Sequence, residues 1–189
     1  MRIIPVETQG VVTLIRSSVC SGYFATGGFT DEMSPNTLLE VNGERLSKLQ
    51  KRAHNDGGVL VVEDESIQLL RYAERRKLRR MSGDKLQSHP ILVMDNAVDK
   101  PLNDKRMGNR VAVGLLKDGR IILAMAHDEE RQGTTATTTG QFAEKILEII
   151  DDEISWLLNL DGGASAFLVT PNYMIAPSNG LVSSYICVE

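Results

Sequence analysis

Residues 111–126 read Val-Ala-Val-Gly-Leu-Leu-Lys-Asp-Gly-Arg-Ile-Ile-Leu-Ala-Met-Ala, which is two apolar runs around an Asp-Gly pair. Apolar runs on both sides of Asp118-Gly119 indicate a β-hairpin, because Asp-Gly readily adopts the backbone conformation of a tight turn. The stretch therefore predicts a hairpin over 111–126 and makes β-structure a main component of the fold.

One helix is expected after this hairpin. Thr138 and Gln141 have the spacing of a capping box, and the apolar residues between 142 and 150 recur on one face. This pattern predicts a packed helix near 140–151. Short apolar or β-branched runs predict strands at 11–16, 38–41, 58–63, 91–94, 156–160, 166–169 and 185–188. Many strands and few helices favour an α/β (α+β) class with a mixed β-sheet, in one domain over residues 1–189.

Composition narrows the function classes. A chain of 189 residues with 42% hydrophobic and 24% charged residues is long enough for one compact domain with a substantial core. The net charge of −4 disfavours bulk binding to nucleic acid or to an anionic membrane surface. No apolar run is long enough to span a bilayer, and the first residues lack the apolar core of a signal peptide. A cytoplasmic location is therefore expected.

The two cysteines, Cys20 and Cys187, are too few for a disulfide scaffold. Two buried thiols in a reducing compartment is the favoured interpretation, and a pair between them is the alternative. No Cys/His cluster has zinc spacing, and the three histidines are far apart in sequence. No metal and no redox cofactor are expected.

The stretch with the most chemical content is Asn159-Leu160-Asp161-Gly162-Gly163-Ala164-Ser165. An apolar strand ends in a carboxylate, and two glycines then allow a sharp turn and close approach of the backbone to a ligand. Successive amides in such a turn can hold an anion, and the carboxylate can orient a hydroxyl, activate water or attack an anomeric carbon. The alternative is a turn without chemistry, which turn propensities alone favour.

The order of several motifs resembles the phosphodiester glycosidase family. The resemblance is closest from about 109 to 180 and looser from 23 to 94. It rests on the turn Thr26-Gly27-Gly28-Phe29-Thr30, the run Arg110-Val111-Ala112-Val113-Gly114 with Asp118-Gly119, the helix at 142–147, the stretch Asn159–Ser165, and Asn172 with Pro177-Ser178. It implies hydrolysis of the bond between a sugar's anomeric carbon and a phosphodiester oxygen, which releases the sugar and a phosphomonoester.

The resemblance also implies a set of site residues. Arg110 would hold the phosphate through its planar fork, and the carboxylate of Asp161 would support an oxocarbenium-like centre. The amides of Gly27, Gly28, Gly162 and Gly163 would complete an anion pocket, with Thr26, Asn159 and Ser165 also against the substrate. His127 is a third catalytic candidate, although a surface histidine is the simpler interpretation. These segments are expected to converge on one cleft.

Two departures from the family pattern keep an alternative open. Thr26 stands where the family has Asn, and Ala164 replaces a Gly, so the chain could be a catalytically degenerate module that binds a sugar phosphate or a nucleotide-derived ligand. The basic run at 71–80 is either a solvated face or an electrostatic funnel toward an anionic substrate. The expected partner is a small sugar phosphodiester or nucleotide-like molecule, with no membrane and no nucleic acid.

Overall fold

The computed structural model describes residues 1–5, 20–31, 34–50, 56–64, 66–100, 102, 105–128, 137–176 and 182–189. The described strands form three five-stranded sheets and a two-stranded ribbon, and all their pairings are antiparallel. One α-helix is described beside them. The α+β class is therefore confirmed, with more sheet than helix. The predicted strand at 11–16 lies outside the described residues.

The sheet that carries the predicted hairpin has the order β11-β10-β14-β12-β13. Its strands are β11 (Ala97–Val98), β10 (Ile91–Met94), β14 (Ile154–Asn159), β12 (Arg110–Leu116) and β13 (Ile121–Ala126). The hairpin β12–β13 is confirmed, with Arg110 paired to Ala126 at its open end. Gly119 has a φ of 93°, which explains the glycine in this turn.

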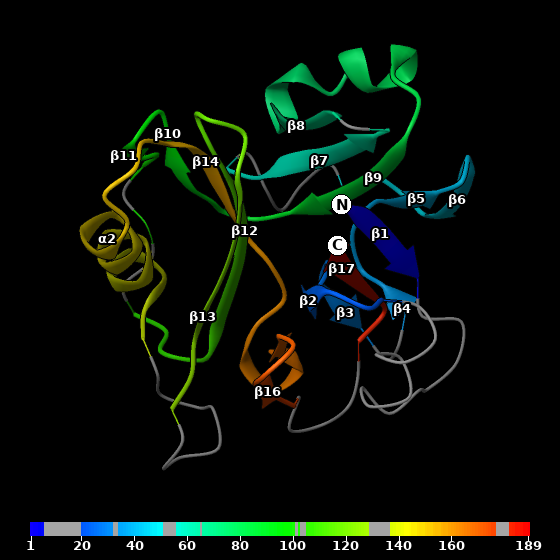
Figure 1. Cartoon of the computed structure of the whole chain (residues 1–189). Helices are drawn as coiled ribbons and strands as arrows, with labels where there is room; N and C mark the ends of the chain where they lie inside the picture. Colours follow the sequence, from blue (N-terminus) through cyan, green and yellow to red (C-terminus); the bar gives the residue numbers. More distant parts are fainter. Residues whose placement is uncertain are drawn as a thin grey trace.

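Helix α2 (Thr139–Ile149) covers one face of this sheet (Figure 1). The capping box is present, because the Thr138 side chain accepts from the Gln141 backbone and the Gln141 side chain reaches back to the Thr138 backbone. Phe142, Ala143 and Ile146 pack into a cluster with residues of β10, β12, β13 and β14. The predicted packed helix is confirmed. No helix in the described part of the chain has the length and apolarity to cross a bilayer.

The second sheet has the order β6-β5-β9-β7-β8. Its strands are β6 (Glu44–Ser47), β5 (Leu39–Val41), β9 (Asp84–Ser88), β7 (Gly58–Glu63) and β8 (Ser66–Arg71), and two short 3-10 helices follow β8, η1 (Tyr72–Glu74) and η2 (Lys77–Arg80). β5 and β7 were predicted, whereas β8 and β9 were not. The sequence of β9, Asp-Lys-Leu-Gln-Ser, is too polar to indicate a strand buried in the middle of a sheet.

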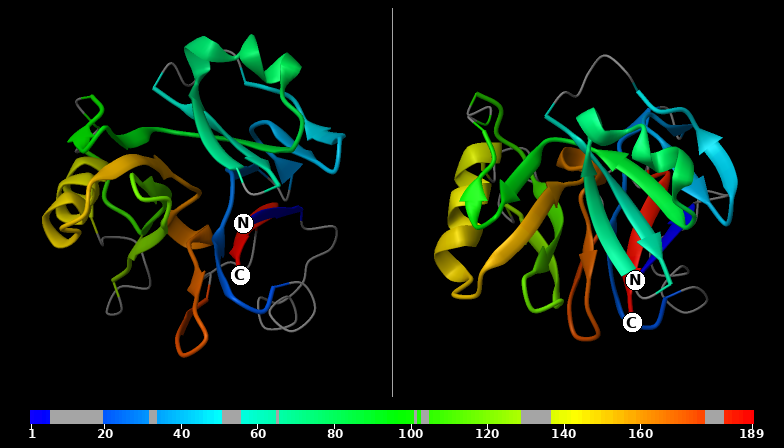
Figure 2. Two further views of the ribbon diagram at one scale, coloured as in Figure 1. Left: turned by 45° about the horizontal axis from the view of Figure 1, so that its top comes forward. Right: turned by 90° about the horizontal axis from the view of Figure 1, so that it is seen from above.

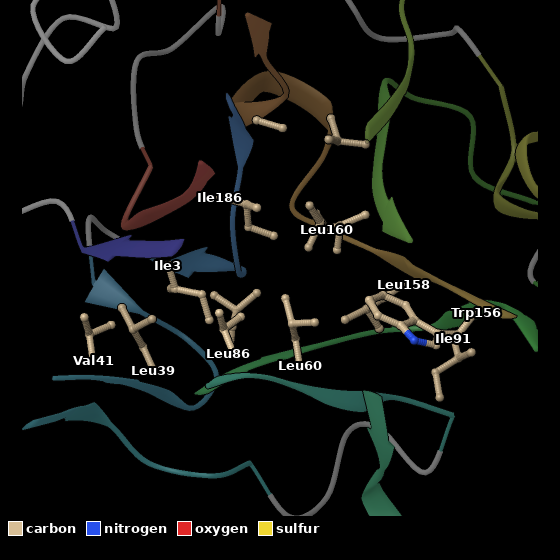
Figure 3. Packing of buried hydrophobic residues seen from close by; sticks show 14 of the residues in the cluster. Ile3, Leu39, Val41, Leu60, Leu86, Ile91, Trp156, Leu158, Leu160 and Ile186 are labelled. Atoms are coloured by element: carbon tan, nitrogen blue, oxygen red, sulfur yellow. The ribbon is translucent and has the colours of Figure 1, made fainter. Parts of the chain in front are cut away.

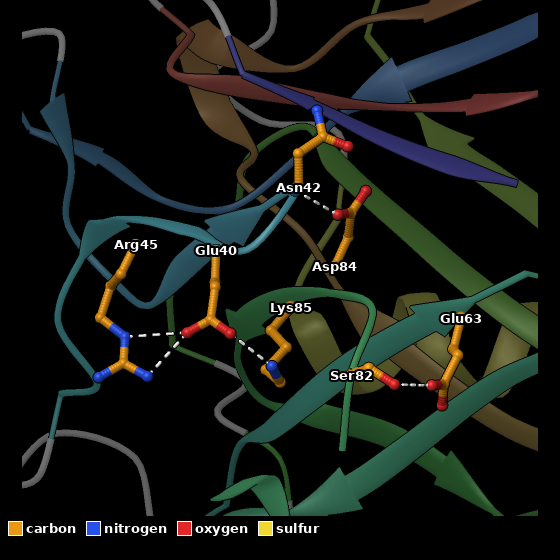
Figure 4. A network of polar contacts seen from close by, with 7 residues as sticks. All are labelled: Glu40, Asn42, Arg45, Glu63, Ser82, Asp84 and Lys85. Carbon is orange, nitrogen blue, oxygen red and sulfur yellow. Dashed lines mark hydrogen bonds and ion pairs between the residues drawn. The ribbon is translucent and has the colours of Figure 1, made fainter. Parts of the chain in front are cut away.

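A buried ion pair explains how β9 tolerates this polarity (Figure 4). Lys85 on β9 lies 2.5 Å from Glu40 on β5, and Arg45 on β6 binds the other oxygen of the same carboxylate at 2.7 Å. Burial alone would raise the pKa of Glu40, but the hydrogen bonds from Lys85 and Arg45 outweigh it and hold that pKa below its usual range. The pairing lets a charged side chain sit inside the sheet at limited cost.

The third sheet has the order β1-β17-β2-β15-β16. Its strands are β1 (Arg2–Pro5), β17 (Ser184–Val188), β2 (Tyr23–Thr26), β15 (Leu168–Val169) and β16 (Met174–Ile175). A ribbon of β3 (Thr30–Asp31) and β4 (Ser34–Pro35) follows β2. Because β1 pairs with β17, the two ends of the chain lie side by side (Figure 2).

All three sheets contribute to one core (Figure 3). Leu39, Leu60 and Leu86 come from the second sheet, and they pack in the same cluster as Ile186 of the third and Leu158 of the first. These five residues are almost completely buried. Because the sheets share this core, the segments that connect their strands begin and end at fixed positions. Those segments carry the residues of the site described below.

The cysteines correct the favoured interpretation of two thiols. Cys20 and Cys187 form a disulfide with a Cα–Cα distance of 5.9 Å, and no free cysteine is present. Both are buried beside Phe24 and Phe167. The sequence did not favour this pair because 167 positions separate the two residues, whereas the pairing of β2 with β17 makes them neighbours.

Candidate active site

The Asp161-Gly162-Gly163 turn follows β14 and leads into the short 3-10 helix η3 (Gly163–Ser165). The Asp161 N–H donates to the carbonyl of Gly27 at 3.0 Å, and the Gly163 N–H donates to the carbonyl of Asn109 at 2.9 Å. These bonds fasten the turn to the segment after β2 and to the start of β12. Three predicted site segments, far apart in sequence, are therefore brought together.

The carboxylate of Asp161 lies inside this junction, with 9% of the residue exposed. Backbone N–H groups of Thr30 and Gly162 and the hydroxyls of Ser165 and Thr30 donate to it. Burial raises the pKa of Asp161 to about 6, against the opposite effect of these four donors. The group is therefore a buried acid that changes charge near neutral pH.

The glycine amides do not form the expected anion pocket, which corrects the sequence prediction. Gly27 donates to the Ser184 carbonyl at 2.9 Å and Gly28 to the Ser184 hydroxyl at 3.1 Å. Gly162 donates to Asp161, and Gly163 to Asn109 as described above. All four amides therefore have protein acceptors, and those of Gly27, Gly28 and Gly163 join separate segments of the chain.

Close packing explains why two of these positions are glycine. A Cβ on Gly27 would lie 2.8 Å from the Ser184 carbonyl oxygen, and one on Gly162 would lie 2.5 Å from the Asn109 carbonyl oxygen. Thr26 is completely buried in β2, and its hydroxyl has no partner among the described residues. Its place against the substrate stays a prediction.

A pocket of about 450 Å³ opens on the α2 side of this junction, within the usual size range of small-molecule sites. Arg110 and Asn159 line it, and so does Phe29, which follows the Gly27-Gly28 pair. The pocket thus contains part of the predicted site. The full lining is Phe29, Asp56, His89, Pro90, Ile91, Lys100, Leu102, Arg106, Arg110, Thr139 and Asn159.

Arg110 is the half-buried cation of the pocket. One of its terminal nitrogens donates to the Arg106 carbonyl at 2.5 Å, and its buried Nε has no partner in the described part of the chain. Burial lowers the pKa of Arg110, but an arginine remains charged at neutral pH. The side chain is held by its own loop and keeps donor capacity for an anion.

Asn159 is the buried polar residue of the pocket wall, with 4% of its surface exposed. Its amide nitrogen donates to the carbonyls of His89 and Leu160, each at 2.9 Å. This fixes the orientation of the side chain, and its Oδ1 has no partner among the described residues. The wall therefore contains one buried acceptor without a partner among the described residues.

Two other features complete the wall. The rings of Phe29 and His89 line the pocket with their centres 4.4 Å apart and their planes tilted by 35°. Thr139 is the first residue of α2, so the positive end of this helix faces the pocket. Flat rings suit the apolar face of a sugar, and a helix N-terminus favours a negatively charged group.

Asp161, Ser165 and His127 are not among the residues that line this pocket. Asp161 lies behind its wall, since Thr30, which binds the carboxylate, directly follows Phe29. His127 follows β13 near Asn109, because the Asp128 N–H donates to the Asn109 side chain at 3.3 Å. Of the three predicted catalytic residues, Arg110 therefore lines the pocket, whereas Asp161 and His127 do not.

Several residues of the site were missed from the sequence. Asp56 lines the pocket in front of β7, and Lys100 and Arg106 lie at its exposed side. Asp56 begins an Asp-Gly-Gly tripeptide identical to the one at 161–163, which was a usable signal. Ser183 and Ser184, which support Thr30 and Gly28, had no such signal.

The basic run at 71–80 lies elsewhere. Its arginines and lysine are mostly exposed, Arg71 binds Asp99, and Lys77 lies 2.5 Å from Glu74. None of these basic residues lines the pocket of Arg110. Among the described residues, one group of three potential metal ligands comes together, Cys20, Cys187 and Glu189, and its two sulfurs are joined in the disulfide.

Comparison with known proteins identifies the family. No curated protein sequence matches significantly. The structure is similar to the catalytic domain of zebrafish N-acetylglucosamine-1-phosphodiester alpha-N-acetylglucosaminidase, auto-inhibited by its pro-peptide, with a TM-score of 0.65 and 13% identity over 99% of this chain and 72% of that one. It is also similar to a hypothetical protein from Synechocystis, with a TM-score of 0.55 and 13% identity over 97% of this chain and 55% of that one. A sequence model of the phosphodiester glycosidase family matches residues 17–189, and the chain belongs to that family.

Proposed function

We propose that this chain is a hydrolase that cleaves the bond between a sugar's anomeric carbon and a phosphodiester oxygen, releasing the sugar and a phosphomonoester. Family membership supports the reaction class, and the similar zebrafish enzyme is named for such a bond. The observation that carries the proposal is Arg110, a half-buried cation with an unpartnered Nε among the described residues, in a pocket of small-molecule size.

Arg110 binds the phosphate in this proposal. Its guanidinium gives charge-assisted hydrogen bonds to phosphate oxygens, and the N-terminus of α2 adds a favourable field at the same pocket. Both groups also stabilise the negative charge that builds up on the leaving phosphate. A phosphate ester leaves readily, so little protonation of the leaving oxygen is needed.

The sugar lies against the other half of the pocket. Oδ1 of Asn159 accepts a hydrogen bond from a sugar hydroxyl, because the amide nitrogen is already committed to two carbonyls. The tilted rings of Phe29 and His89 offer aromatic surface for the apolar face of the sugar ring. These contacts place the anomeric carbon between the phosphate at Arg110 and the wall in front of Asp161.

Two carboxylates support the reaction from different positions. Glycoside hydrolysis commonly uses a carboxylate pair around an oxocarbenium-like centre. Asp56 lines the pocket and faces the reacting centre, where it activates water or supports the positive charge. Asp161 acts as a positioning residue, since it holds Thr30, and through it Phe29, against the pocket while its charge stands behind that wall.

A second candidate is a module that binds the ligand without turning it over. The observation that favours it is the position of Asp161, whose carboxylate is buried beside protein donors and is not part of the pocket lining. Both candidates place the ligand at Arg110. They differ in whether a bond is broken.

Release of reducing sugar from a panel of sugar-1-phosphodiesters separates the candidates. The hydrolase predicts release by the wild-type protein and a large loss in Arg110→Ala, with Arg120→Ala as the matched control on the exposed hairpin turn. The module predicts a ligand-induced rise in melting temperature without sugar release. A panel that neither releases sugar nor shifts the melting temperature contradicts both.

A further inference from the structure

The pocket has more positive charge than the reaction requires. Lys100, Arg106 and Arg110 line it, and Asp56 is the one carboxylate among its described lining residues. With His89 neutral, the formal charge of this lining is +2. A phosphodiester carries a single negative charge at neutral pH, so one cation remains without a counterpart when such a substrate binds.

Acidic groups in the described part of the chain do not remove this excess. Asp99 precedes Lys100 in sequence, but its two carboxylate oxygens bind the guanidinium of Arg71. No ion pair is recorded for Lys100 or Arg106 with another described residue. The pocket therefore presents net positive charge to whatever enters it.

The three cations also lie at different depths. Arg110 is half-buried, whereas Lys100 and Arg106 are exposed. A single phosphate held by Arg110 leaves the two outer cations for another negative group further from the sugar. Charge complementarity of this kind favours a ligand whose anionic groups follow the same order.

We propose that the substrate is a sugar joined through its anomeric carbon to a diphosphate, with the inner phosphate at Arg110 and the outer phosphate at Lys100 and Arg106. This inference rests on the proposed function. Water adds to the anomeric carbon, the bond from that carbon to the phosphate oxygen breaks, and the oxygen keeps the electron pair. The products are the free sugar and a diphosphate monoester, and one proton from the water passes to solvent.

The same chemistry occurs in two sources, a sugar on a nucleoside diphosphate and a sugar on an alkyl diphosphate. The decisive comparison uses one sugar on three leaving groups, an alkyl phosphate, an alkyl diphosphate and a nucleoside diphosphate. We expect kcat/KM for both diphosphates to exceed that for the alkyl phosphate by about tenfold or more, the scale of one charge-assisted contact. Equal values for the two alkyl compounds would overturn the inference.

Variants test whether the outer cations cause the preference. Lys100→Gln and Arg106→Gln should each reduce the ratio of kcat/KM between alkyl diphosphate and alkyl phosphate by about tenfold. Lys77→Gln, on the basic run outside this pocket, should leave the ratio unchanged. A ratio that survives both pocket variants would contradict the assignment of the outer phosphate.

Calorimetry keeps the inference separate from the proposed function. If no compound is hydrolysed, the hydrolase proposal fails, but the dissociation constants of the same alkyl compounds still decide the charge argument. Tighter binding of the diphosphate by about tenfold supports the inference, with that advantage lost in Lys100→Gln. Equal affinities of the two alkyl compounds would overturn it.

Discussion

The tripeptide Asp-Gly-Gly occurs twice in this chain, at 56–58 before β7 and at 161–163 after β14. Asp161 is buried, accepts four hydrogen bonds from the protein and has its pKa raised to about 6. Asp56 is half-buried and lines the pocket beside Arg110 and Asn159. An identical local sequence thus produces a structural junction in one place and a pocket-lining aspartate in the other.

The neighbouring segments cause this difference. Asp161 follows a buried strand; its backbone binds Gly27, and its carboxylate is buried beside Thr30 from another part of the chain and Ser165 from its own turn. Asp56 precedes a strand, and its carbonyl accepts from Ile91 at 2.8 Å, which fixes the backbone beside the pocket. The motif defines a turn, and the tertiary contacts decide which atoms of that turn meet a ligand.

The largest expected effect comes from Asp56, which lines the pocket. Asp56→Asn should reduce kcat on the order of a thousandfold, because it removes the charge that we propose acts on the reacting centre. The melting temperature should change little, since the side chain is not part of the core. Steady-state kinetics and thermal unfolding on one preparation check both points. A well-folded variant with normal kcat would exclude Asp56 from the chemistry.

The buried carboxylate should affect stability in a pH-dependent way. The pKa of Asp161 is about 6 in the folded protein, against 3.8 for an ordinary aspartate, which stands for the unfolded chain. Between these two pH values the folded protein still holds a proton that the unfolded chain has lost. The stability contributed by this group is therefore complete below about pH 4 and lost as the pH rises to 6. The shift in pKa from 3.8 to about 6 corresponds to about 3 kcal/mol in the free energy of unfolding.

Denaturant unfolding of wild type and Asp161→Asn between pH 3.5 and 7.5 measures this difference. The free energy of unfolding of the variant should rise relative to wild type by about 3 kcal/mol over that range. A constant difference would show that Asp161 does not change its charge in the native state as proposed. Its burial already shows that a strand-end turn need not be peripheral to the fold.

Turnover should respond to Asp161 less than to Asp56. Asp161→Asn is expected to lower kcat on the order of a hundredfold, because the variant weakens the support of Thr30 and Phe29 and removes a charge behind the wall. The wild-type kcat should rise as the pH increases through about 6, and this inflection should be absent in the variant. A larger loss than in Asp56→Asn would reverse the roles of the two tripeptides.

The smallest effect concerns the shape of the phosphate contact. Arg110→Lys should keep the fold and weaken transition-state stabilisation by about 1–3 kcal/mol, because an ammonium does not reproduce the planar fork. The ratio of kcat/KM between variant and wild type measures the loss, and Arg120→Lys is the matched control. Unchanged kinetics on a verified substrate would remove Arg110 from the site.

Local signals predicted much of the fold. The Asp-Gly turn gave the β12–β13 hairpin, and the Thr138 and Gln141 pair gave the start of α2, because both depend on residues that are close in sequence. β9 was missed because its buried lysine is tolerated only through Glu40 on another strand. The disulfide was only the alternative interpretation for a similar reason, since the pairing of β2 with β17 brings Cys20 and Cys187 together.

The site was predicted in part, for a related reason. The segments around Gly27, Arg110 and Asp161 do come together, but the sequence did not show that the glycine amides already have protein acceptors. Most of these acceptors are on Ser184 and Asn109. Neither residue belongs to a recognisable sequence motif. The cytoplasmic location stays a prediction, and the Cys20–Cys187 disulfide opposes it, since such bonds persist mainly in oxidising compartments.

A crystal structure of Asp56→Asn with an uncleaved sugar-1-phosphodiester tests the central claim most directly. The variant removes the charge proposed to act on the substrate and keeps the pocket intact. We predict the phosphate within hydrogen-bond distance of Arg110, a sugar hydroxyl on Oδ1 of Asn159, and the Asp161 carboxyl still bound to Thr30 and Ser165. A ligand bound directly to Asp161, with the Arg110 pocket empty, would contradict the account.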